Sequence, residues 1–275
     1  MAMATRPVGT GGDLLPVIGL GTWQQFDVGP KADLSRQRQV LDVLFEAGGT
    51  VIDASPMYGQ AEARVGDLLR DMDRVDAAYL ATKVWTRGRA AGLAQMERSR
   101  WLMGGRLDLM QVHNLLDLDS HVETIRAWKH DGVIRHWGIT HYTSSALPAL
   151  ERAIDKHAPD FVQLAYSIGV REPEQRVLPL CLERGIAVLA NRPLEGGGLM
   201  RKLRDRPLPP EAAEFGAASW GQLALRFILA HPAVTCVIPG TDDPAHMADN
   251  AAAGADPMPE PAAQAAMASL WAKSG

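Results

Sequence analysis

Four polar residues have side chains that can act together in acid–base catalysis. Each lies at or just after the end of an apolar run. Asp53 and Tyr58 lie five positions apart in Ile-Asp-Ala-Ser-Pro-Met-Tyr, Lys83 follows a second apolar run, and His113 follows a third. A tyrosine has a pKa near ~10 and is a weak acid at neutral pH, but a neighbouring ammonium stabilises its phenolate. An aspartate keeps a buried lysine charged, and a histidine can donate a hydrogen bond to a carbonyl oxygen. Such a set would protonate an oxygen while a hydride arrives at the attached carbon, which requires a nicotinamide.

The apolar pattern of the chain indicates which elements hold these residues. Eight short apolar runs alternate with longer segments of helical period, and the runs are Val17–Leu20, Thr50–Asp53, Ala78–Thr82, Leu107–Val112, Ile134–Ile139, Phe161–Leu164, Ile186–Ala190 and Val234–Ile238. The helical segments include Arg36–Ala47, Ala61–Asp71, His121–Asp131, Leu147–His157 and Trp220–Ala230. Unbroken apolar strands that each precede a helix are typical of a parallel sheet covered by helices. Eight such units in about 240 residues predict an α/β fold, a closed (β/α)8 TIM barrel.

A doubly wound sheet is the alternative α/β fold, and the glycine pattern disfavours it. Its fingerprint, GxGxxG after the first strand, is incomplete because Gly19-Leu-Gly21 continues as Thr-Trp-Gln. We therefore expect one barrel domain over residues 1–275, with an N-terminal extension and an Ala-rich C-terminal helix, Pro257–Lys273, packed against its outside. Catalytic residues of such barrels lie at the carboxyl ends of the strands, so the four polar residues can converge there. The segment Glu195–Pro210 is expected to be a long loop on the same face.

Composition and charge exclude several other classes of protein. Hydrophobic residues make up 47% of the chain and charged residues 22%, which is typical of a globular domain. The net charge of -4 argues against nucleic-acid binding, which needs a surplus of Lys and Arg. No apolar run approaches the ~20 residues of a membrane span, and residues 1–12 lack the apolar core of a signal peptide, so we expect a cytoplasmic protein. Cys181 and Cys236 are expected to be free buried thiols, and the lack of HExxH, CxxC and GxSxG motifs predicts no metal site and no serine esterase.

On these residues, the chain resembles an aldo-keto reductase over essentially its whole length. The segment Pro16–Trp23 is similar to the opening strand of that family, and Ala81–Trp85 and Gln111–Asn114 are similar to the segments that contain its catalytic lysine and histidine. The resemblance implies a catalytic tetrad of Asp53, Tyr58, Lys83 and His113. It also implies the activity, which is NAD(P)H-dependent reduction of an aldehyde or ketone to an alcohol with tyrosine as the acid.

The resemblance implies a cofactor as well, NADPH ahead of NADH. Gly138-Ile-Thr140-His141 stands where the family usually has Gly-Val-Ser-Asn, whose polar side chains hold the nicotinamide carboxamide, and Gln163 matches a third contact. Asn191 occupies the position of an aromatic residue that stacks on the nicotinamide, so this stacking face is lost. The implied cofactor contacts are Thr22, Trp23, Thr140, His141, Gln163, Asn191, Arg192, Pro193, Leu194, Ile238, Gly240, Thr241, His246, Asp249 and Asn250.

Two positions of the implied adenosine-phosphate site depart from the family. Gly240 stands where the family often has Lys, and His246 where it has Arg. Those cations bind the 2′-phosphate that distinguishes NADPH from NADH. The backbone of Gly240 and the hydroxyl of Thr241 still provide a phosphate site near a helix start. Arg192 or the basic residues of the Glu195–Pro210 loop could supply the missing charge.

Other readings of the same residues stay open at this point. Trp23, Met57, Trp85 and Asn114 are expected to line a substrate pocket, although the tryptophans could instead cap the barrel core. The tetrad could serve an alcohol dehydrogenase or an epimerising enzyme that passes through a ketone. A nicotinamide-binding partner protein with little turnover, like the channel-associated members of the family, is an alternative from another class. In a further alternative, Asp53 and Lys83 form only a structural ion pair beside the packed ring of Tyr58. We expect a monomer that binds a small carbonyl or alcohol substrate.

Overall fold

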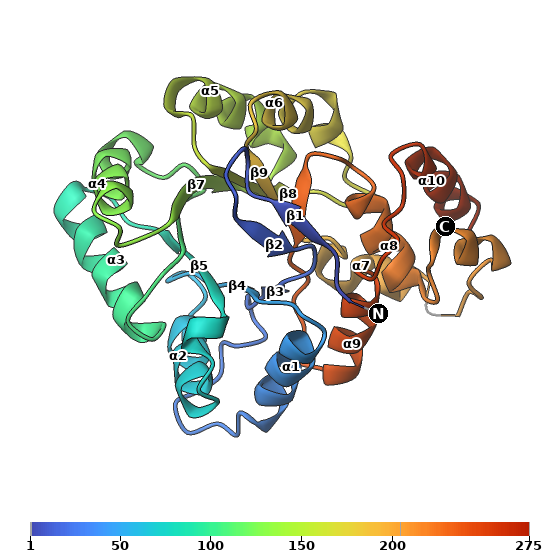
Figure 1. Ribbon diagram of the computed structural model, residues 1–275, viewed down its shortest axis with the longest axis horizontal. Coiled ribbons are helices and arrows are strands. Elements are labelled where there is room, and N and C mark those ends of the chain that lie inside the picture. Colours follow the sequence, from blue (N-terminus) through green and yellow to red (C-terminus); the bar gives the residue numbers. More distant parts are fainter. Residues whose placement is uncertain (1, 204, 275) are drawn as a thin grey trace.

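Eight parallel strands form the centre of the molecule in the order in which they occur along the chain, which confirms the predicted barrel (Figure 1). The structure is a computed structural model, and it describes residues 2–203 and 205–274. The strands are β3 (Leu20–Gly21), β4 (Val51–Asp53), β5 (Tyr79–Val84), β6 (Leu109–His113), β7 (His136–His141), β8 (Phe161–Ala165), β9 (Ala187–Asn191) and β10 (Val234–Val237). Parallel bridges from Ile18 to Val237 and from Gly21 to Gly240 join the first strand to the last and close the barrel.

The first strand differs from its predicted bounds. We expected Val17–Leu20, whereas regular pairing with β4 is confined to β3. The residues before β3 bond to the last strand instead: the Gly19 N–H donates to the Val237 carbonyl over 2.9 Å, and the Val237 N–H donates to the Val17 carbonyl over 2.8 Å. The apolar run is therefore part of the barrel wall, but its backbone is shared between two neighbours.

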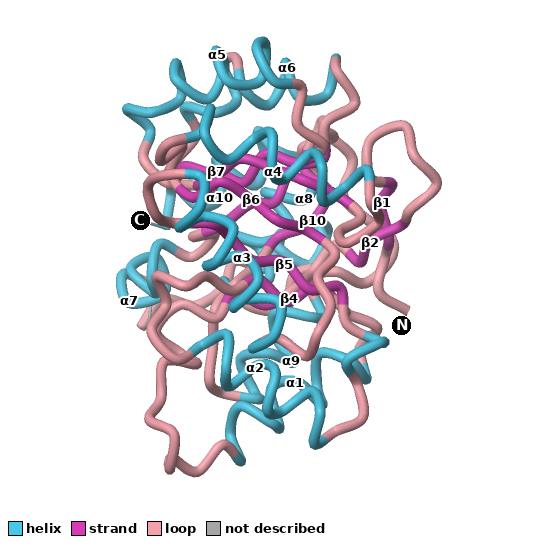
Figure 2. The backbone as a smooth tube through the Cα atoms, turned by 90° about the vertical axis from the view of Figure 1, so that its left-hand side faces the viewer, coloured by secondary structure: helices cyan, strands magenta, loops and turns pink. Residues whose placement is uncertain are grey.

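Helices surround the strands (Figures 1 and 2). They are α1 (Ser35–Glu46), α2 (Ala61–Asp71), α3 (Arg89–Leu102), α4 (Leu118–His130), α5 (Leu147–His157), α6 (Val177–Glu183), α8 (Trp220–Leu229) and α9 (Pro244–Ala252). The five helical segments named from sequence agree with α1, α2, α4, α5 and α8 to within three residues at each end. In α1, the apolar residues Val40, Leu41 and Leu44 are fully buried, because their spacing puts them on the helix face that covers the strands.

The N-terminal extension is a hairpin of β1 (Thr5–Pro7) and β2 (Leu14–Pro16), paired antiparallel. Val8 and Leu15 belong to the same buried cluster as Phe161, Leu189 and Cys236, which lie on barrel strands. The extension therefore contributes side chains to the barrel core. In Figure 2 the hairpin lies to one side of the strands, near the chain's N-terminus.

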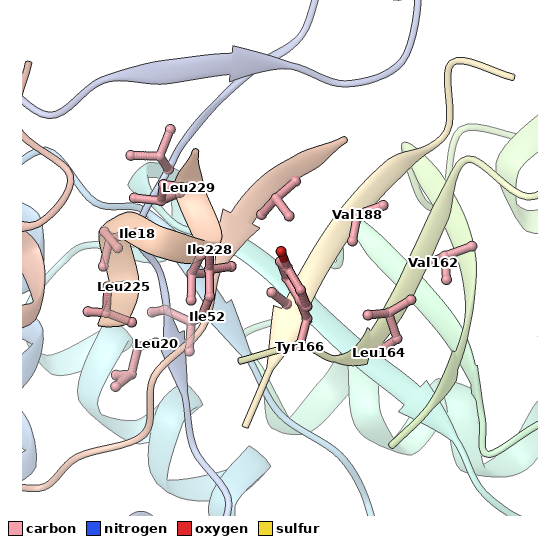
Figure 3. Packing of buried hydrophobic residues seen from close by; sticks show 14 of the residues in the cluster. Ile18, Leu20, Ile52, Val162, Leu164, Tyr166, Val188, Leu225, Ile228 and Leu229 are labelled. Carbon is pink, nitrogen blue, oxygen red and sulfur yellow. The ribbon is translucent and has the colours of Figure 1, made fainter. Parts of the chain in front are cut away.

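The main core lies between the strands and the outer helices, and Figure 3 shows part of it. Ile18, Leu20 and Ile52 from the first strands share this cluster with Leu225 and Ile228 of α8. All five side chains are fully buried. Truncation of such a residue to alanine costs about 2–5 kcal/mol, because both transfer energy and packing are lost.

The C-terminal helix α10 (Ala263–Ser274) packs outside the barrel against α8, as predicted (Figure 1). The rings of Trp220 and Trp271 meet edge to face with centroids 5.6 Å apart. The helix begins at Ala263 rather than at the predicted Pro257, because the prolines in the preceding segment lack the N–H that a helix interior requires.

The segment Glu195–Pro210 is only partly a loop, in contrast to its prediction. It contains the short helix α7 (Gly198–Lys202), and Leu199 and Leu203 are both buried. Apolar residues four positions apart lie on one side of a helical turn, so their burial favours this turn. The cysteines are free and buried, as expected, and burial raises the pKa of Cys181 to about 12. Among the described residues, no helix is both long and apolar enough to cross a membrane.

Candidate active site

Three neighbouring strands bring the four predicted catalytic residues together. Asp53 ends β4, Lys83 lies on β5, His113 ends β6, and Tyr58 lies in the turn after β4. The Lys83 Nζ donates to Asp53 Oδ2 over 2.6 Å and to the Ala54 carbonyl over 2.8 Å. The same Nζ is 4.9 Å from the centroid of the Tyr58 ring, and the Tyr58 and His113 rings are 5.9 Å apart. The arrangement comes from parallel strands of similar register, since their carboxyl ends meet on one face.

Burial controls the charges of this group. Burial alone would lower the pKa of Lys83, but the Asp53 carboxylate and Tyr58 offset it, and the pKa of Lys83 is raised. Burial raises the pKa of Tyr58, and the positive charge of Lys83 opposes that rise only in part. At neutral pH the lysine is therefore charged, and the tyrosine carries its proton.

His113 is held in a neutral state. Burial, followed by the nearby positive charge of Lys83 and the proximity of His141, lowers the pKa of His113 to about 3. Its Nδ1 lies 2.9 Å from the Ser55 hydroxyl oxygen, which also accepts the Met57 N–H over 3.2 Å. Ser55 was not singled out from the sequence. Its position between Asp53 and Tyr58, two residues beyond the strand end, is the signal that could have identified it.

A network of amides extends from Asp53 across the barrel. The second carboxylate oxygen, Oδ1, accepts hydrogen bonds from Gln163 Nε2 over 2.8 Å and from Gln111 Nε2 over 3.2 Å. The Gln163 side-chain oxygen then accepts from Asn191 Nδ2 over 3.2 Å and from the Thr140 hydroxyl over 3.4 Å. Gln111 is a further residue that sequence reasoning missed, although alternation along the strand places it on the same side as His113.

A cavity of about 780 Å³ opens over this group. At the catalytic end it is lined by these predicted residues: Thr22, Trp23, Asp53, Met57, Tyr58, His113, Asn114, Thr140, Gln163 and Asn191. Beyond β9 and β10 it is lined by these: Arg192, Pro193, Leu194, Ile238, Gly240, Thr241, His246, Asp249 and Asn250. The structure thus gathers most of the residues proposed for cofactor and substrate around a single cavity.

Two residues proposed for cofactor or substrate contact do not line it. Trp85 is 41% exposed, its ring lies 6.4 Å from the His113 ring, and its backbone N–H donates to the side-chain oxygen of Gln95. The His141 ring stacks on Tyr142, with centroids 5.9 Å apart, and its Nδ1 accepts hydrogen bonds from the following turn. Its imidazole is held by its own turn, so the structure gives no support for a carboxamide contact like that of asparagine in the family.

Other cavity residues were missed in the sequence. Tyr142 follows β7 and could have been found by the rule that residues at strand ends line the site. Met200, Trp220 and Asp242 also line the cavity, but they come from α7, α8 and the segment before α9. Their positions depend on how these segments fold over the barrel, which the local sequence does not indicate.

The cavity has features that fit a dinucleotide. At the catalytic end, the side-chain oxygens of Asn114 and Asn191 are buried and have no hydrogen-bond partner among the described residues, so they can accept N–H groups such as those of a carboxamide. At the other end, Ser219 and Thr241 lie near the starts of α8 and α9, where backbone N–H groups suit phosphate. The backbones of Gly21 and Gly240 approach closely there, and a Cβ on Gly240 would lie 3.0 Å from the Gly21 carbonyl oxygen.

A parallel barrel with a buried Asp–Lys pair beside a tyrosine, under a cavity that suits a dinucleotide, is the arrangement expected of a nicotinamide-dependent oxidoreductase. The chain belongs to the aldo/keto reductase family, whose model matches residues 17–266. Methylglyoxal reductase YeaE of Escherichia coli (strain K12) is 28% identical over 262 residues, covering 91% of this chain and 89% of that protein. An NADH-specific methylglyoxal reductase of the same strain is 28% identical over 228 residues, covering 71% and 68%. The crystal structure of an aldo/keto reductase from Klebsiella pneumoniae in complex with NADP and acetate is 29% identical, with a TM-score of 0.76, and covers 94% of this chain and 92% of that one.

Proposed function

We propose that this chain is an NAD(P)H-dependent reductase that converts an aldehyde or ketone to the corresponding alcohol. The observation that carries the proposal is the placement of Lys83 Nζ, 2.6 Å from Asp53 and 4.9 Å from the Tyr58 ring centroid, below a cavity that His113 also lines. The similarity to a methylglyoxal reductase supports carbonyl reduction as the type of reaction.

Tyr58 is the proton donor in this proposal. Its raised pKa keeps the phenol protonated at neutral pH, so the proton is available to a carbonyl oxygen. Loss of that proton leaves a phenolate, which the buried ammonium of Lys83 stabilises. Asp53 keeps Lys83 charged in a site where burial alone would favour the neutral amine.

His113 orients the carbonyl oxygen. The Ser55 oxygen accepts the Met57 N–H, so its own hydrogen is available to Nδ1 of His113. We therefore assign the imidazole proton to Nε2, from which it can be donated to a substrate oxygen. The nicotinamide supplies the hydride when it is bound.

Residues on both sides of the barrel would hold the cofactor. Thr140, Gln163 and Asn191 are the proposed contacts to the nicotinamide carboxamide, and the unpartnered oxygen of Asn191 suits its N–H group. Thr241 and the N-terminal residues of α8 and α9 are the proposed phosphate contacts. We place NADPH ahead of NADH because the Klebsiella pneumoniae relative was solved with NADP. Gly240 and His246 weaken that preference, because neither supplies the fixed cation of Lys or Arg.

The test is the loss of reduced-nicotinamide absorbance with a reactive aromatic aldehyde, for the wild type and Tyr58→Phe. We expect turnover by the wild type and a loss of about 10²-fold or more in the variant. Cofactor affinity, measured by quenching of protein fluorescence, should be nearly equal for the two proteins. Near-normal turnover by Tyr58→Phe would exclude it as the acid. Cofactor binding without turnover on a panel of carbonyls and alcohols would favour a binding role instead.

A further inference from the structure

Arg192 is the first residue after β9, and its backbone has an unusual conformation. Its φ of 52° lies in the left-handed region, which non-glycine residues rarely adopt. Such conformations cost energy and cluster at binding sites, where the surrounding structure maintains them. The neighbours on either side, Asn191 and Pro193, both line the cavity, as does Arg192 itself.

The side chain of Arg192 points toward β7. Its guanidinium carbon lies 5.6 Å from the centroid of the Tyr142 ring, and Tyr142 directly follows β7. In the sheet, β8 lies between β9 and β7, whereas β10 lies on the opposite side of β9. Of the proposed phosphate contacts, Thr241 and the start of α9 follow β10, and the start of α8 lies in the connection from β9 to β10. The guanidinium therefore extends away from the phosphate end of the cavity.

Within the part of the chain that the structure describes, no carboxylate neutralises this guanidinium. In the ranges 2–203 and 205–274, no acidic side chain forms an ion pair with Arg192 within 4.0 Å. The acidic residues of the cavity wall have other partners: Asp53 pairs with Lys83, Asp249 accepts from Ser219 and Gln222, and Asp242 lies 3.8 Å from Arg36. Arg192 is the only lysine or arginine among the described residues that line the cavity.

We propose that Arg192, held against Tyr142, binds a carboxylate of the substrate, so that the preferred substrates are aldehydes or ketones that carry an acid group. A guanidinium over an aromatic ring keeps its N–H groups available, and their spacing matches the two oxygens of a carboxylate. The inference rests on the proposed reductase function and specifies its substrate class. It also gives Arg192 a role other than the cofactor contact expected from the sequence.

The test compares 4-carboxybenzaldehyde with 4-nitrobenzaldehyde, which has nearly the same shape but no charge. Arg192→Gln should raise KM for the carboxylate substrate about tenfold and leave KM for the nitro substrate within about twofold. Arg192→Lys should recover part of the loss, because it keeps the charge but not the paired geometry. Arg74→Gln is the matched control, since Arg74 also lies over an aromatic ring, that of Phe45, but outside the cavity.

Two binding measurements separate this inference from its rivals. If Arg192→Gln weakens NADPH and NADH binding about tenfold and raises KM for both aldehydes alike, the residue holds the cofactor, and the inference is overturned. Benzoate binding to the complex with NADP⁺, measured by calorimetry, should weaken in Arg192→Gln but not in Arg74→Gln. If the wild type turns over both aldehydes and Arg192→Gln affects both equally, the carboxylate inference is overturned, but the proposed reductase function stands. If no aldehyde is turned over but benzoate binding depends on Arg192, the proposed reductase function is overturned, and the carboxylate site stands.

Discussion

The Nζ atom of Lys83 lies 2.6 Å from Oδ2 of Asp53, and the two side chains are 0% and 3% exposed. A buried ion pair is weak evidence for stability, because the cost of desolvating two charges offsets their attraction. Here the second oxygen of Asp53 is also satisfied, by Gln111 and Gln163. The pair is therefore fully hydrogen-bonded, and the charge of the lysine is fixed beside Tyr58 rather than screened by water.

Replacement of one partner of this pair should destabilise the protein more than replacement of both. We expect Lys83→Met to lower the free energy of unfolding by about 3–5 kcal/mol, because Asp53 is left as an uncompensated buried charge. The double variant Asp53→Asn, Lys83→Met should regain most of that loss. Urea unfolding measures the stability, and turnover should stay absent in both variants. A double variant no more stable than the single one would contradict this account of the pair.

Ser55 should matter to the reaction through His113. In Ser55→Ala the imidazole loses the partner at 2.9 Å that fixes its proton on Nε2. The loss of one hydrogen bond, about 0.5–1.5 kcal/mol, predicts a decrease in kcat/KM of about two- to tenfold with cofactor affinity unchanged. Ser145→Ala, at an exposed position after β7, is the control. Equal kinetics of Ser55→Ala and the wild type would show that the imidazole needs no such partner.

The pH profile should show no histidine limb. The pKa of His113 is lowered to about 3, so the imidazole stays neutral from pH 5 to 8, and kcat/KM for reduction should be constant there. Activity should fall only as Tyr58 loses its proton, above the ordinary tyrosine value of ~10, since burial raises its pKa. A midpoint between pH 6 and 7 in a plot of kcat/KM against pH would instead indicate that a protonated His113 is required.

The same lowered pKa makes a prediction for stability. The unfolded chain takes up a proton on His113 near pH 6.5, whereas the folded protein does not until about pH 3. Stability from this group is therefore present above pH 6.5 and is lost as the pH falls toward 3. In His113→Gln, the decrease in the free energy of unfolding between pH 7 and pH 5 should be smaller than in the wild type.

His246→Arg should shift cofactor preference toward NADPH. His246 is exposed on α9 and lines the cavity, so an arginine there would place a permanent charge near the proposed adenosine end. A charge-assisted contact to the 2′-phosphate predicts an increase of about tenfold in the NADPH to NADH affinity ratio. Fluorescence titration measures both dissociation constants. His130→Arg, an exposed substitution of the same kind on α4, should leave the ratio unchanged, and an equal shift in both variants would point to a general charge effect.

Most of the fold could be predicted because each inner strand is a short, mainly apolar segment that is followed by a longer segment of helical period. The exceptions have physical causes. The first strand divides its hydrogen bonds between two neighbours, and α10 begins only after Pro261. Helix α3 was not among the segments named from sequence, and its few buried residues, Gly92, Met96 and Ser99, give it little apolar pattern.

The site residues that could be predicted from the sequence are those that lie at the ends of barrel strands. Asp53, Lys83 and His113 end neighbouring strands or lie near their ends, so the barrel brings them together. His141 and Trp85 also lie at strand ends, yet neither lines the cavity. The following turn holds the His141 imidazole, and Trp85 is half-exposed with its ring beside that of His113. Residues such as Met200 and Trp220 reach the cavity through the folding of distant segments, which no local pattern indicates.

The junction between the first strand and the last is the seam of the barrel, where isolated bridges replace a continuous ladder. Gly21, Ile238 and Gly240 lie along this seam and also line the cavity. The N-terminal hairpin spans it, because Arg6 donates hydrogen bonds to the carbonyls of His231 and Val234, just before and within β10. Local opening of a sheet is easiest where few backbone hydrogen bonds join neighbouring strands. Beside the proposed phosphate end this pairing includes the Gly21 N–H, which donates to the Pro239 carbonyl over 3.0 Å, whereas the hairpin holds the other, amino end of β10.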